Sequence, residues 1–408
     1  MSVYLLATLD TKGREAEFLR ARLRACGATV TLVDTGAQGV PACPADVSRE
    51  EVFRAGGVES AEIAAAGDRG RAVAVAAAGA AELVREHYAA GRVSGVLAIG
   101  GSAGSTIGSA AMRALPLGVP KLLVSTLASG QVRHYVGDKD VLMLNAVVDI
   151  AGLNRISRAV LDEAARAMAG MVCYPAAAAS GDDRPLVAAT MFGVTTPCVE
   201  RARQRLEEAG YEVLVFHATG SGGQAMESLI AEGLIAGVLD ITTTELADEI
   251  VGGLLSAGPD RLTAAARTGV PQVVSVGATD MVNFHAPETV PERFDGRMFY
   301  RHNANVTLMR TTAEENARIG ADIGRKLEAS RGPAVIMLPT AGVSAIDRAG
   351  QPFDDPAARQ ALFDAIRHNA GATEVVTLDR HINDPEFADT AAARLIAMMR
   401  EHKPCRPA

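Results

Sequence analysis

The chain of 408 residues carries 40 basic and 48 acidic side chains, so its formal net charge is −8, and it contains no tryptophan. This balance argues against a nucleic-acid binder, because neutralising a phosphate backbone requires a basic footprint. The five cysteines are scattered and form no CxxC pair, which favours a reducing compartment over a disulfide framework. No basic region precedes the first apolar run, and no apolar run is long enough to span a membrane. We therefore expect a cytoplasmic protein whose partners are neither nucleic acid nor membrane.

Short β-branched runs alternate with longer amphipathic segments along the chain, which is typical of parallel sheets covered by helices. The expected strands of the first half are residues 3–8, 29–33, 93–99 and 121–125. A helix at residues 15–26, ended by Gly27, connects the first two strands. The last part of the chain is predicted to contain a helix at residues 359–368, a strand at residues 374–378 and a helix that begins at Pro385.

The chain also repeats parts of itself in order. LLATLDTK and ACGATVTLVDTG near the start are echoed by VAATMFGV and EAGYEVLVFHATG, so that Thr8 matches Thr190 and Gly27 matches Gly210. A second echo pairs GVPKLLVS, which begins at Gly118, with GVPQVVS, which begins at Gly269. These echoes predict an α/β fold of two doubly wound, Rossmann-like parallel-sheet domains related by internal duplication. We place an N-terminal nucleotide-binding domain at residues 1–175, a linker rich in Ala, Ser, Asp and Pro at residues 176–185, and a C-terminal domain at residues 186–408.

The stretch VLAIGGSAGSTIGSAAMR leads from an apolar strand through glycines into a helix-like segment. Glycine permits a positive φ and a close approach to a ligand, and the helix that follows presents free N–H groups to an anion. The loop matches neither the Walker A pattern nor GxGxxG, so a purely structural turn is the alternative.

Polar residues follow the other strands of the first half, and ligands of open parallel sheets bind at that edge. Lys12 brings a positive charge suited to a polyphosphate, and Asp34 ends a strand where a carboxylate can accept hydrogen bonds from a ribose. The predicted ligand is a nucleotide. Its predicted contacts are Asp10, Thr11, Lys12, Asp34, Gly100, Gly101, Ser102, Gly104, Ser105, Thr106, Thr126, Ser129 and Gly130.

The second half has polar loops of its own, among them FHATGSGGQAME, a second candidate anion nest. Several histidines lie in these loops, which indicates an acid–base role, whereas no HxH or HExxH spacing predicts a metal site. Cys198 is interpreted as a packing residue near a helix start. The candidate catalytic residues are His217, Asp240 and His302. The candidate substrate-binding residues are Thr219, Gly220, Ser221, Gly222, Gly223, Thr243, Thr244, Glu245, Asp280, Asn283, Asn303 and Arg310.

Several long motifs resemble one family, which is uncharacterised in function and includes the ATP-binding N-terminal region of the tomato mosaic virus resistance protein. The motifs are LDTKG, GGSAGST, VSTLASG, DIAGLN, TMFGVTTPCV, FHATGSGG, LDITTTELAD, DMVNF and HNANVTLMRTT. The resemblance implies two α/β domains, ATP bound in the first domain and a homodimer. Ala103 stands where the family usually has glycine, and a left-handed conformation there would weaken phosphate binding.

The leading hypothesis is a cytoplasmic protein that binds ATP, with or without Mg²⁺, and has a polar interdomain cleft. One alternative is an enzyme acting on a small phosphorylated or carboxylated metabolite, which the polar loops of the second half favour. Another is a protein-interaction module that the nucleotide stabilises. The sequence leaves open whether the protein is an enzyme.

Overall fold

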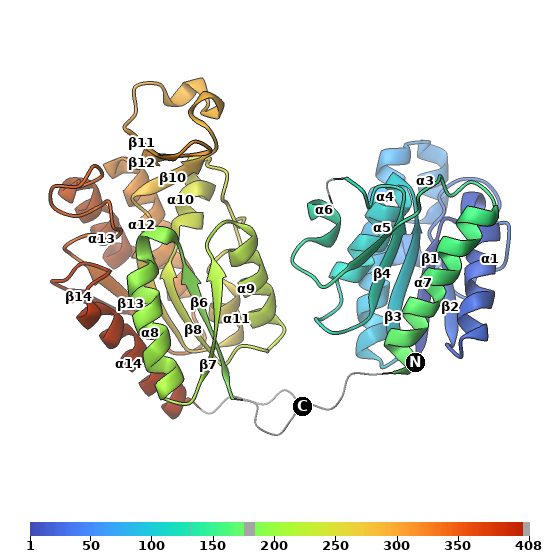
Figure 1. The fold of residues 1–408 in the computed structure, drawn as a ribbon, viewed down its shortest axis with the longest axis horizontal. Helices are drawn as coiled ribbons and strands as arrows, with labels where there is room; N and C mark the ends of the chain where they lie inside the picture. The colour runs from blue at the N-terminus through green and yellow to red at the C-terminus, as the bar shows by residue number, and fades with distance from the viewer. Residues whose placement is uncertain (131, 175–183, 403–408) are drawn as a thin grey trace. The chain divides into compact units, whose positions relative to one another are not determined.

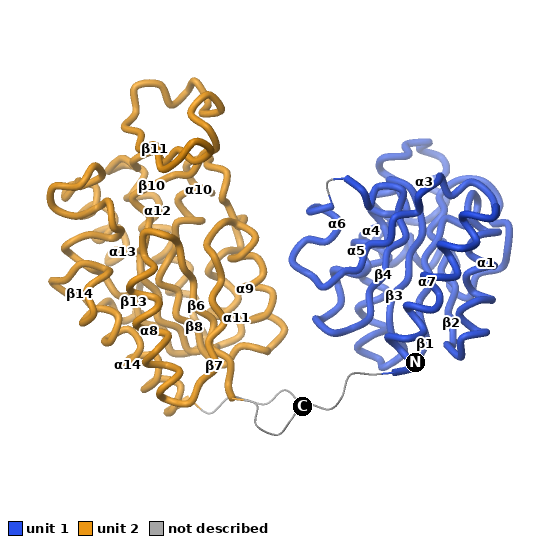
Figure 2. Tube along the Cα trace, viewed as in Figure 1, with its two compact units in different colours: residues 1–179 blue, residues 180–408 orange. Residues whose placement is uncertain are grey.

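The computed structural model describes residues 1–130, 132–174 and 184–402. The chain divides into two compact units, Met1–Ala179 and Ser180–Ala408, which Figure 2 shows in different colours. The predicted linker at residues 176–185 lies outside the described residues except for Arg184 and Pro185. In the described part of the chain, no helix is both long and apolar enough to cross a membrane. Each unit is an α/β fold with its own parallel sheet.

Unit 1 is built on a five-stranded sheet in the order β2-β1-β3-β4-β5, in which every pairing is parallel. Its strands are β1 (Ser2–Ala7), β2 (Val30–Asp34), β3 (Val93–Gly100), β4 (Lys121–Ser125) and β5 (Leu142–Asn145). One face packs against α1 (Leu9–Ala25) and α7 (Arg155–Cys173), and the other against α2 (Arg49–Ala55), α4 (Arg69–Ala89) and α5 (Ser102–Arg113) (Figure 1). The short helices α3 (Ser60–Ala66) and α6 (Arg133–Val136) complete the unit.

The first helix begins earlier than the sequence pattern predicts. We expected a helix at residues 15–26, but α1 starts at Leu9, so the motif LDTKG forms its first turn rather than a loop. The Leu9 N–H donates to Asp34 Oδ1 at 3.1 Å, and this contact with the end of β2 satisfies a donor that a helix start leaves free. Lys12 has non-helical torsions (φ −125°, ψ 17°) and marks a kink there.

Unit 2 contains a six-stranded parallel sheet in the order β14-β13-β9-β8-β6-β7 and a three-stranded antiparallel sheet in the order β10-β12-β11. The parallel strands are β6 (Leu186–Met191), β7 (Glu212–His217), β8 (Gly237–Thr242), β9 (Gln272–Gly277), β13 (Ala334–Pro339) and β14 (Glu374–Leu378). The antiparallel strands, which the sequence analysis missed, are β10 (Met281–Phe284), β11 (Phe299–Asn303) and β12 (Val306–Arg310).

Helices cover both faces of the larger sheet of unit 2 (Figure 1). One face packs against α8 (Thr196–Glu208) and α14 (Pro385–Glu401). The remaining helices are α9 (Ser221–Ala231), α10 (Thr244–Val251), α11 (Ala264–Thr268), α12 (Ala313–Glu328) and α13 (Pro356–Asn369), with short 3-10 turns η1 (Gly193–Thr195), η2 (Pro287–Thr289) and η3 (Glu292–Phe294). The predicted strand at residues 374–378 and the helix start at Pro385 are confirmed.

The two parallel sheets share one topology. Counted along the chain, the first four strands of each unit take the order second, first, third, fourth, and the later strands extend the same edge. The sequence echoes fall on equivalent places: Gly27 (φ 89°) and Gly210 (φ 93°) follow the first long helix, while Gly118 (φ 84°) and Gly269 (φ 79°) precede the fourth strand. A shared topology with matched left-handed glycines is what internal duplication requires.

Candidate functional site

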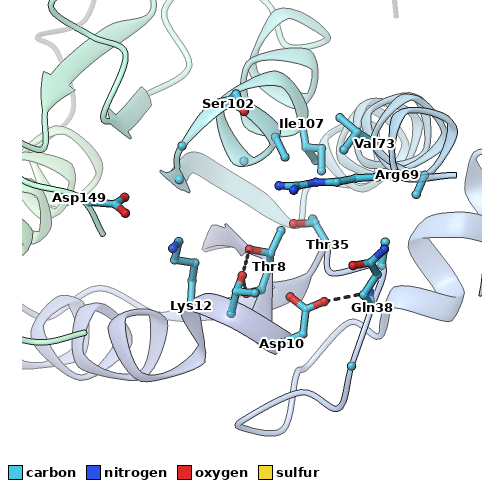
Figure 3. A pocket seen from close by; sticks show the side chains of 18 residues that line it. Thr8, Asp10, Lys12, Thr35, Gln38, Arg69, Val73, Ser102, Ile107 and Asp149 are labelled. Carbon is cyan, nitrogen blue, oxygen red and sulfur yellow. Dashed lines mark hydrogen bonds between the residues drawn. The ribbon is translucent and has the colours of Figure 1, made fainter. Parts of the chain in front are cut away.

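Unit 1 has a cavity of about 480 Å³ at the edge of the sheet where its parallel strands end (Figure 3). This volume lies within the range of small-molecule pockets. Its polar lining consists of Thr8, Asp10, Thr11, Lys12, Thr35, Gln38, Gly39, Arg69, Gly100, Gly101, Ser102, Gly104 and Asp149, and its apolar lining of Ala37, Ala72, Val73, Ala103 and Ile107. The structure thus brings together the predicted residues that follow β1 and β3.

Three helices of unit 1 begin at this cavity, because the residues of their first turns line it. The start of α5 is the most open to an anion. The first intrahelical bond runs from the Ser105 N–H to the Gly101 carbonyl, so the N–H groups of Ser102, Ala103 and Gly104 have no partner within the helix. Free N–H groups and the positive end of the helix dipole together favour a phosphate.

Two cationic side chains reach the cavity from different helices. Figure 3 shows Lys12, from α1, and Arg69, from the start of α4, on different sides of the same space. Among the described residues, neither side chain forms an ion pair. The carboxylate of Asp10 accepts a hydrogen bond from the Gln38 N–H at 2.9 Å, and Asp149 adds a second carboxylate from the segment after β5. The cavity therefore holds both cations for an anion and oxygens for a metal ion.

The glycines of the loop serve close packing rather than a left-handed turn. The torsion φ is negative at Gly100, Gly101, Ala103 and Gly104, so our expectation of a positive φ in this loop is wrong. A Cβ on Gly104 would lie 2.8 Å from the Ile99 carbonyl oxygen, and a Cβ on Gly100 would lie 2.7 Å from the Gly104 Cα. Glycine is needed here because α5 begins directly against the end of β3. Ala103 lies within α5, so it carries none of the strain that a left-handed position would impose.

Asp34 is a structural residue and lies away from the cavity wall. It is 1% exposed, and its Oδ1 accepts the N–H groups of Leu9 at 3.1 Å and Gly36 at 2.8 Å. Its Oδ2 accepts from Arg49 Nε at 2.7 Å. Asp34 thus holds the starts of α1 and α2 in place, and it does not line the cavity where a ribose acceptor was predicted.

The other predicted nucleotide contacts lie beside the cavity. Ser105 is buried and its Oγ is 2.6 Å from Ser125 Oγ, while the Thr106 hydroxyl donates to the Ser102 carbonyl within α5. Thr126 and Ser129 line a smaller cavity of about 330 Å³, which shares Asp149 with the larger one. Gly130 closes the turn there through its N–H, which donates to the Leu127 carbonyl.

Six polar residues of the cavity are absent from the predicted contacts: Thr8, Thr35, Gln38, Gly39, Arg69 and Asp149. Thr8 directly precedes the LDTKG motif, and Thr35 belongs to the DTG cluster at the end of β2. Gln38 and Gly39 lie just after that cluster, and Asp149 begins the DIAGLN motif, so a signal existed for five of the six. Arg69 had no such signal. It follows α2 and α3, and only the fold brings the start of α4 to the sheet edge.

In unit 2 the second glycine nest exists, but a side chain of the protein fills it. The N–H groups of Gly220 and Gly223 donate to Glu245 Oε1 at 2.7 and 3.0 Å. A Cβ on Gly223 would lie 2.2 Å from Glu245 Oε2, so the glycine is required for this contact. Burial raises the pKa of Glu245, and the neighbouring Arg261 guanidinium acts against that rise. The predicted anion nest is therefore occupied by a carboxyl group of the chain itself.

Asp240 belongs to the same buried cluster. It is fully buried, and Arg261 donates to both of its oxygens at 2.5 and 2.7 Å. The Thr190 hydroxyl also donates to Asp240, at 2.7 Å. Burial lowers the pKa of Arg261, yet the carboxylates of Asp240 and Glu245 raise it well above its usual value. The structure thus places Asp240 in the interior, apart from His217 and His302.

Four further substrate-binding candidates are also buried in unit 2. The Thr243 hydroxyl donates to the Ser275 carbonyl, and the Thr244 hydroxyl accepts from Asn283 Nδ2. Asp280 accepts from the Ser344 hydroxyl at 2.8 Å, and Arg310 donates to the Asp280 carbonyl at 3.2 Å. Their polar groups serve the interior of the unit.

Ser221 and Gly222 lie in the first turn of α9. The remaining five candidates of unit 2 line a second cavity, of about 350 Å³. It contains His217, Thr219, Asn283, His302 and Asn303, which are separated by up to 86 positions in the sequence. His285 and an apolar wall also line the cavity. That wall consists of Phe192, Val194, Leu254, Leu255, Phe284, Val306 and Leu308.

Residues with covalent or metal chemistry do not add to either cavity. Cys198 is fully buried in α8, and burial raises its pKa to about 12, which confirms its interpretation as a packing residue. Among the described residues, no group of three or more His, Cys, Asp or Glu side chains is arranged to hold a metal ion.

Fold and site together define a class of protein. It has two α/β units, and at the edge of the N-terminal parallel sheet it has a cavity where helix α5 begins directly after two glycines. Models of the N-terminal and C-terminal domains of the uncharacterised protein family UPF0261 match residues 1–177 and 184–399. The chain belongs to this family, as its motifs predicted.

Individual relatives agree with this assignment. The chain is 48% identical over 399 residues to a UPF0261 protein of Clostridium tetani, covering 97% of this chain and 98% of that protein. It is 38% identical over 431 residues to the ToMV resistance protein Tm-1(GCR237) of Solanum lycopersicum, covering 100% of this chain and 57% of that protein. The solved structure of the glycosyltransferase SnogD from Streptomyces nogalater matches 98% of this chain and 100% of that chain, but at 13% identity and a TM-score of 0.18 it carries no argument.

Proposed function

We propose that the protein binds a nucleotide, and ATP in particular, in the cavity of unit 1. The observation that carries this proposal is the convergence of the open start of α5 with two unpaired cations, Lys12 and Arg69, on one cavity. Free N–H groups at a helix start and nearby cations are the groups that bind a polyphosphate. The family resemblance supplies the choice of ATP among nucleotides.

The lining suggests how the nucleotide is oriented. The phosphates would lie against Gly101 and Ser102, at the start of α5, where Lys12 reaches them. The base would lie against the apolar side chains of Val73 and Ile107, which line the same cavity. Asp10 and Asp149 supply the carboxylate oxygens that an accompanying Mg²⁺ prefers.

The test is the effect of ATP with Mg²⁺ on thermal unfolding, because a ligand that binds only the native state raises its stability. We expect the melting temperature to rise with ATP concentration. Lys12→Ala and Arg69→Ala should reduce this rise, because each removes a cation from the cavity. Arg14→Ala and Arg71→Ala are matched controls, since each removes an arginine from the same helix, α1 or α4, outside the cavity lining.

Two outcomes would contradict the proposal: no stabilisation at millimolar ATP, or an equal loss of stabilisation in the cavity variants and in their controls. Isothermal titration calorimetry of the same variants would separate weaker binding from a change in the stability of the free protein.

We further propose that the protein acts in the cytoplasm as a homodimer, which the family resemblance implies. Light scattering after size-exclusion chromatography measures the mass in solution. A mass of one chain, 42.4 kDa, with and without ATP would contradict the dimer.

A further inference from the structure

We propose that the cavity of unit 2 is a second ligand site, which binds a small uncharged molecule that combines a flat apolar ring with a hydroxyl or N–H donor. This inference goes beyond nucleotide binding, because every residue that carries it belongs to unit 2.

The lining of the cavity carries no permanently charged side chain. Its walls consist of aliphatic and aromatic side chains, together with histidine, asparagine and threonine. None of its lining residues is Asp, Glu, Lys or Arg. The nearby glycine nest, which would otherwise attract an anion, is already filled by Glu245. A charged ligand would therefore find no permanently charged partner in the lining, which favours an uncharged one.

Asn283 presents an acceptor that lacks a donor. The side chain is 1% exposed, and its Nδ2 donates to Asp248 Oδ2 at 2.6 Å and to Thr244 Oγ1 at 3.3 Å. These two bonds orient the amide, so the oxygen Oδ1 lies opposite them. Oδ1 is buried and has no hydrogen-bond partner among the described residues. A buried acceptor without a donor costs about 1–3 kcal/mol, which favours a rearrangement of the cavity wall that opens Oδ1 to a donor from the ligand.

His217 adds a second acceptor to the same cavity. Its Nδ1 lies 3.0 Å from the Met191 carbonyl oxygen, which can only accept, so Nδ1 carries the hydrogen. In the neutral imidazole, Nε2 is then the free acceptor. His217 Nε2 is therefore open to a donor from the ligand, and Asn283 Oδ1 is a second acceptor in the wall of the cavity.

Aromatic side chains account for the flat ring. The rings of Phe192 and His217 stack with their centroids 5.4 Å apart and an interplanar angle of 26°. Phe284 and Leu308 line the same cavity and come from the antiparallel sheet that unit 1 lacks. Aromatic rings prefer offset-stacked or edge-to-face neighbours, and a planar ligand satisfies either arrangement.

Three related probes test the chemistry of the ligand. Indole has a flat ring with an N–H donor, N-methylindole has the same ring without the donor, and indole-3-acetate adds a negative charge. Binding to the full chain is measured from the NMR shifts of the histidine ring protons. We expect indole to bind with a dissociation constant of about 1 mM or lower, and both other probes to bind roughly tenfold more weakly. N-methylindole loses one hydrogen bond, and indole-3-acetate has to desolvate its carboxylate.

Two variants test the place of binding. His217→Phe keeps an aromatic ring beside Phe192 but removes the acceptor, so indole should bind roughly tenfold more weakly. Leu254→Trp should abolish binding by filling the cavity, whereas Leu234→Trp, at a similarly exposed leucine outside the cavity lining, should leave binding unchanged. All three variants should keep the ATP-induced stabilisation of the parent, which separates this test from that of the proposed function.

The proposal is overturned if indole does not bind at millimolar concentration, or if N-methylindole binds as tightly as indole. Equal binding of indole-3-acetate would overturn the uncharged class of ligand. Unchanged indole binding in Leu254→Trp, with that variant folded by circular dichroism, would show that the probe binds elsewhere.

Discussion

Asp248 is a buried carboxylate that contacts Asn283 of the second cavity, and its protonation makes the stability of the fold depend on pH. It is fully buried in α10, where its Oδ1 accepts the N–H groups of Asn283 at 2.9 Å and Leu255 at 3.3 Å. Burial raises its pKa to about 7 from an ordinary value of 3.8. Burial raises the pKa of Asp280 to about 7 as well, with the neighbouring Asp347 adding to that rise. These carboxylates keep a proton in the folded chain at pH values where the unfolded chain has lost it.

The pH dependence of stability follows from the sign of that difference. Between about pH 4 and pH 7 the folded chain binds the extra proton, so the free energy of unfolding falls as pH rises, by about 1.4 kcal/mol per pH unit for each such group. Asp248→Asn removes one such group, so the stability of this variant should decline less steeply over this interval. Urea denaturation at a series of pH values measures the slope. Asp260→Asn, at an exposed carboxylate, should keep the slope of the parent, and an unchanged slope in Asp248→Asn would refute the assignment.

At the scale of elements, the start of α5 depends on how closely a helix approaches a strand. The sequence pattern predicted a glycine loop between a strand and a helix, and it explained the glycines by their freedom to adopt positive φ. The structure gives a different reason, since these glycines have negative φ and Gly104 packs against the Ile99 carbonyl. Local patterns do not reveal this reason, because close packing depends on where the next element lies.

Two neighbouring glycines test that reason. Gly104→Ala places a Cβ 2.8 Å from the Ile99 carbonyl oxygen, so α5 has to shift, and we expect a loss of about 1–3 kcal/mol in the free energy of unfolding of unit 1 and weaker ATP binding. Gly101→Ala has a nearest contact of 3.6 Å, to Thr126 Oγ1, and should be tolerated. Urea denaturation and calorimetry measure the two effects. Equal stabilities of the two variants would disprove the role of close packing.

The first helix shows the same limit of prediction. Its apolar periodicity becomes visible at residue 15, and the helix was therefore expected to begin there. It begins at Leu9 because Asp34, which is distant in sequence, accepts the first N–H. A helix start that is capped by a residue of the next strand has no local signal.

At the scale of the whole molecule, two units of one topology carry different sites. The start of α5 in unit 1 is open to an anion, whereas the glycine nest of unit 2 is closed by Glu245. We therefore expect isothermal titration calorimetry to give one ATP per chain. A stoichiometry of two would show that unit 2 also binds the nucleotide and would contradict the role assigned to Glu245.

The sequence by itself determined the alternation of strands and helices, the duplicated topology, the family, and the glycines and Lys12 that line the first cavity. These features are local or repeat along the chain, so periodicity and motif reveal them. Only the tertiary structure decided that Arg69 joins the first cavity, that Asp34 is buried beneath it, that Glu245 fills the second nest, and that Asn283 and His217 share a cavity. The reason is that neighbouring parallel strands are joined by long crossover connections, so residues that meet at one sheet edge come from distant parts of the chain.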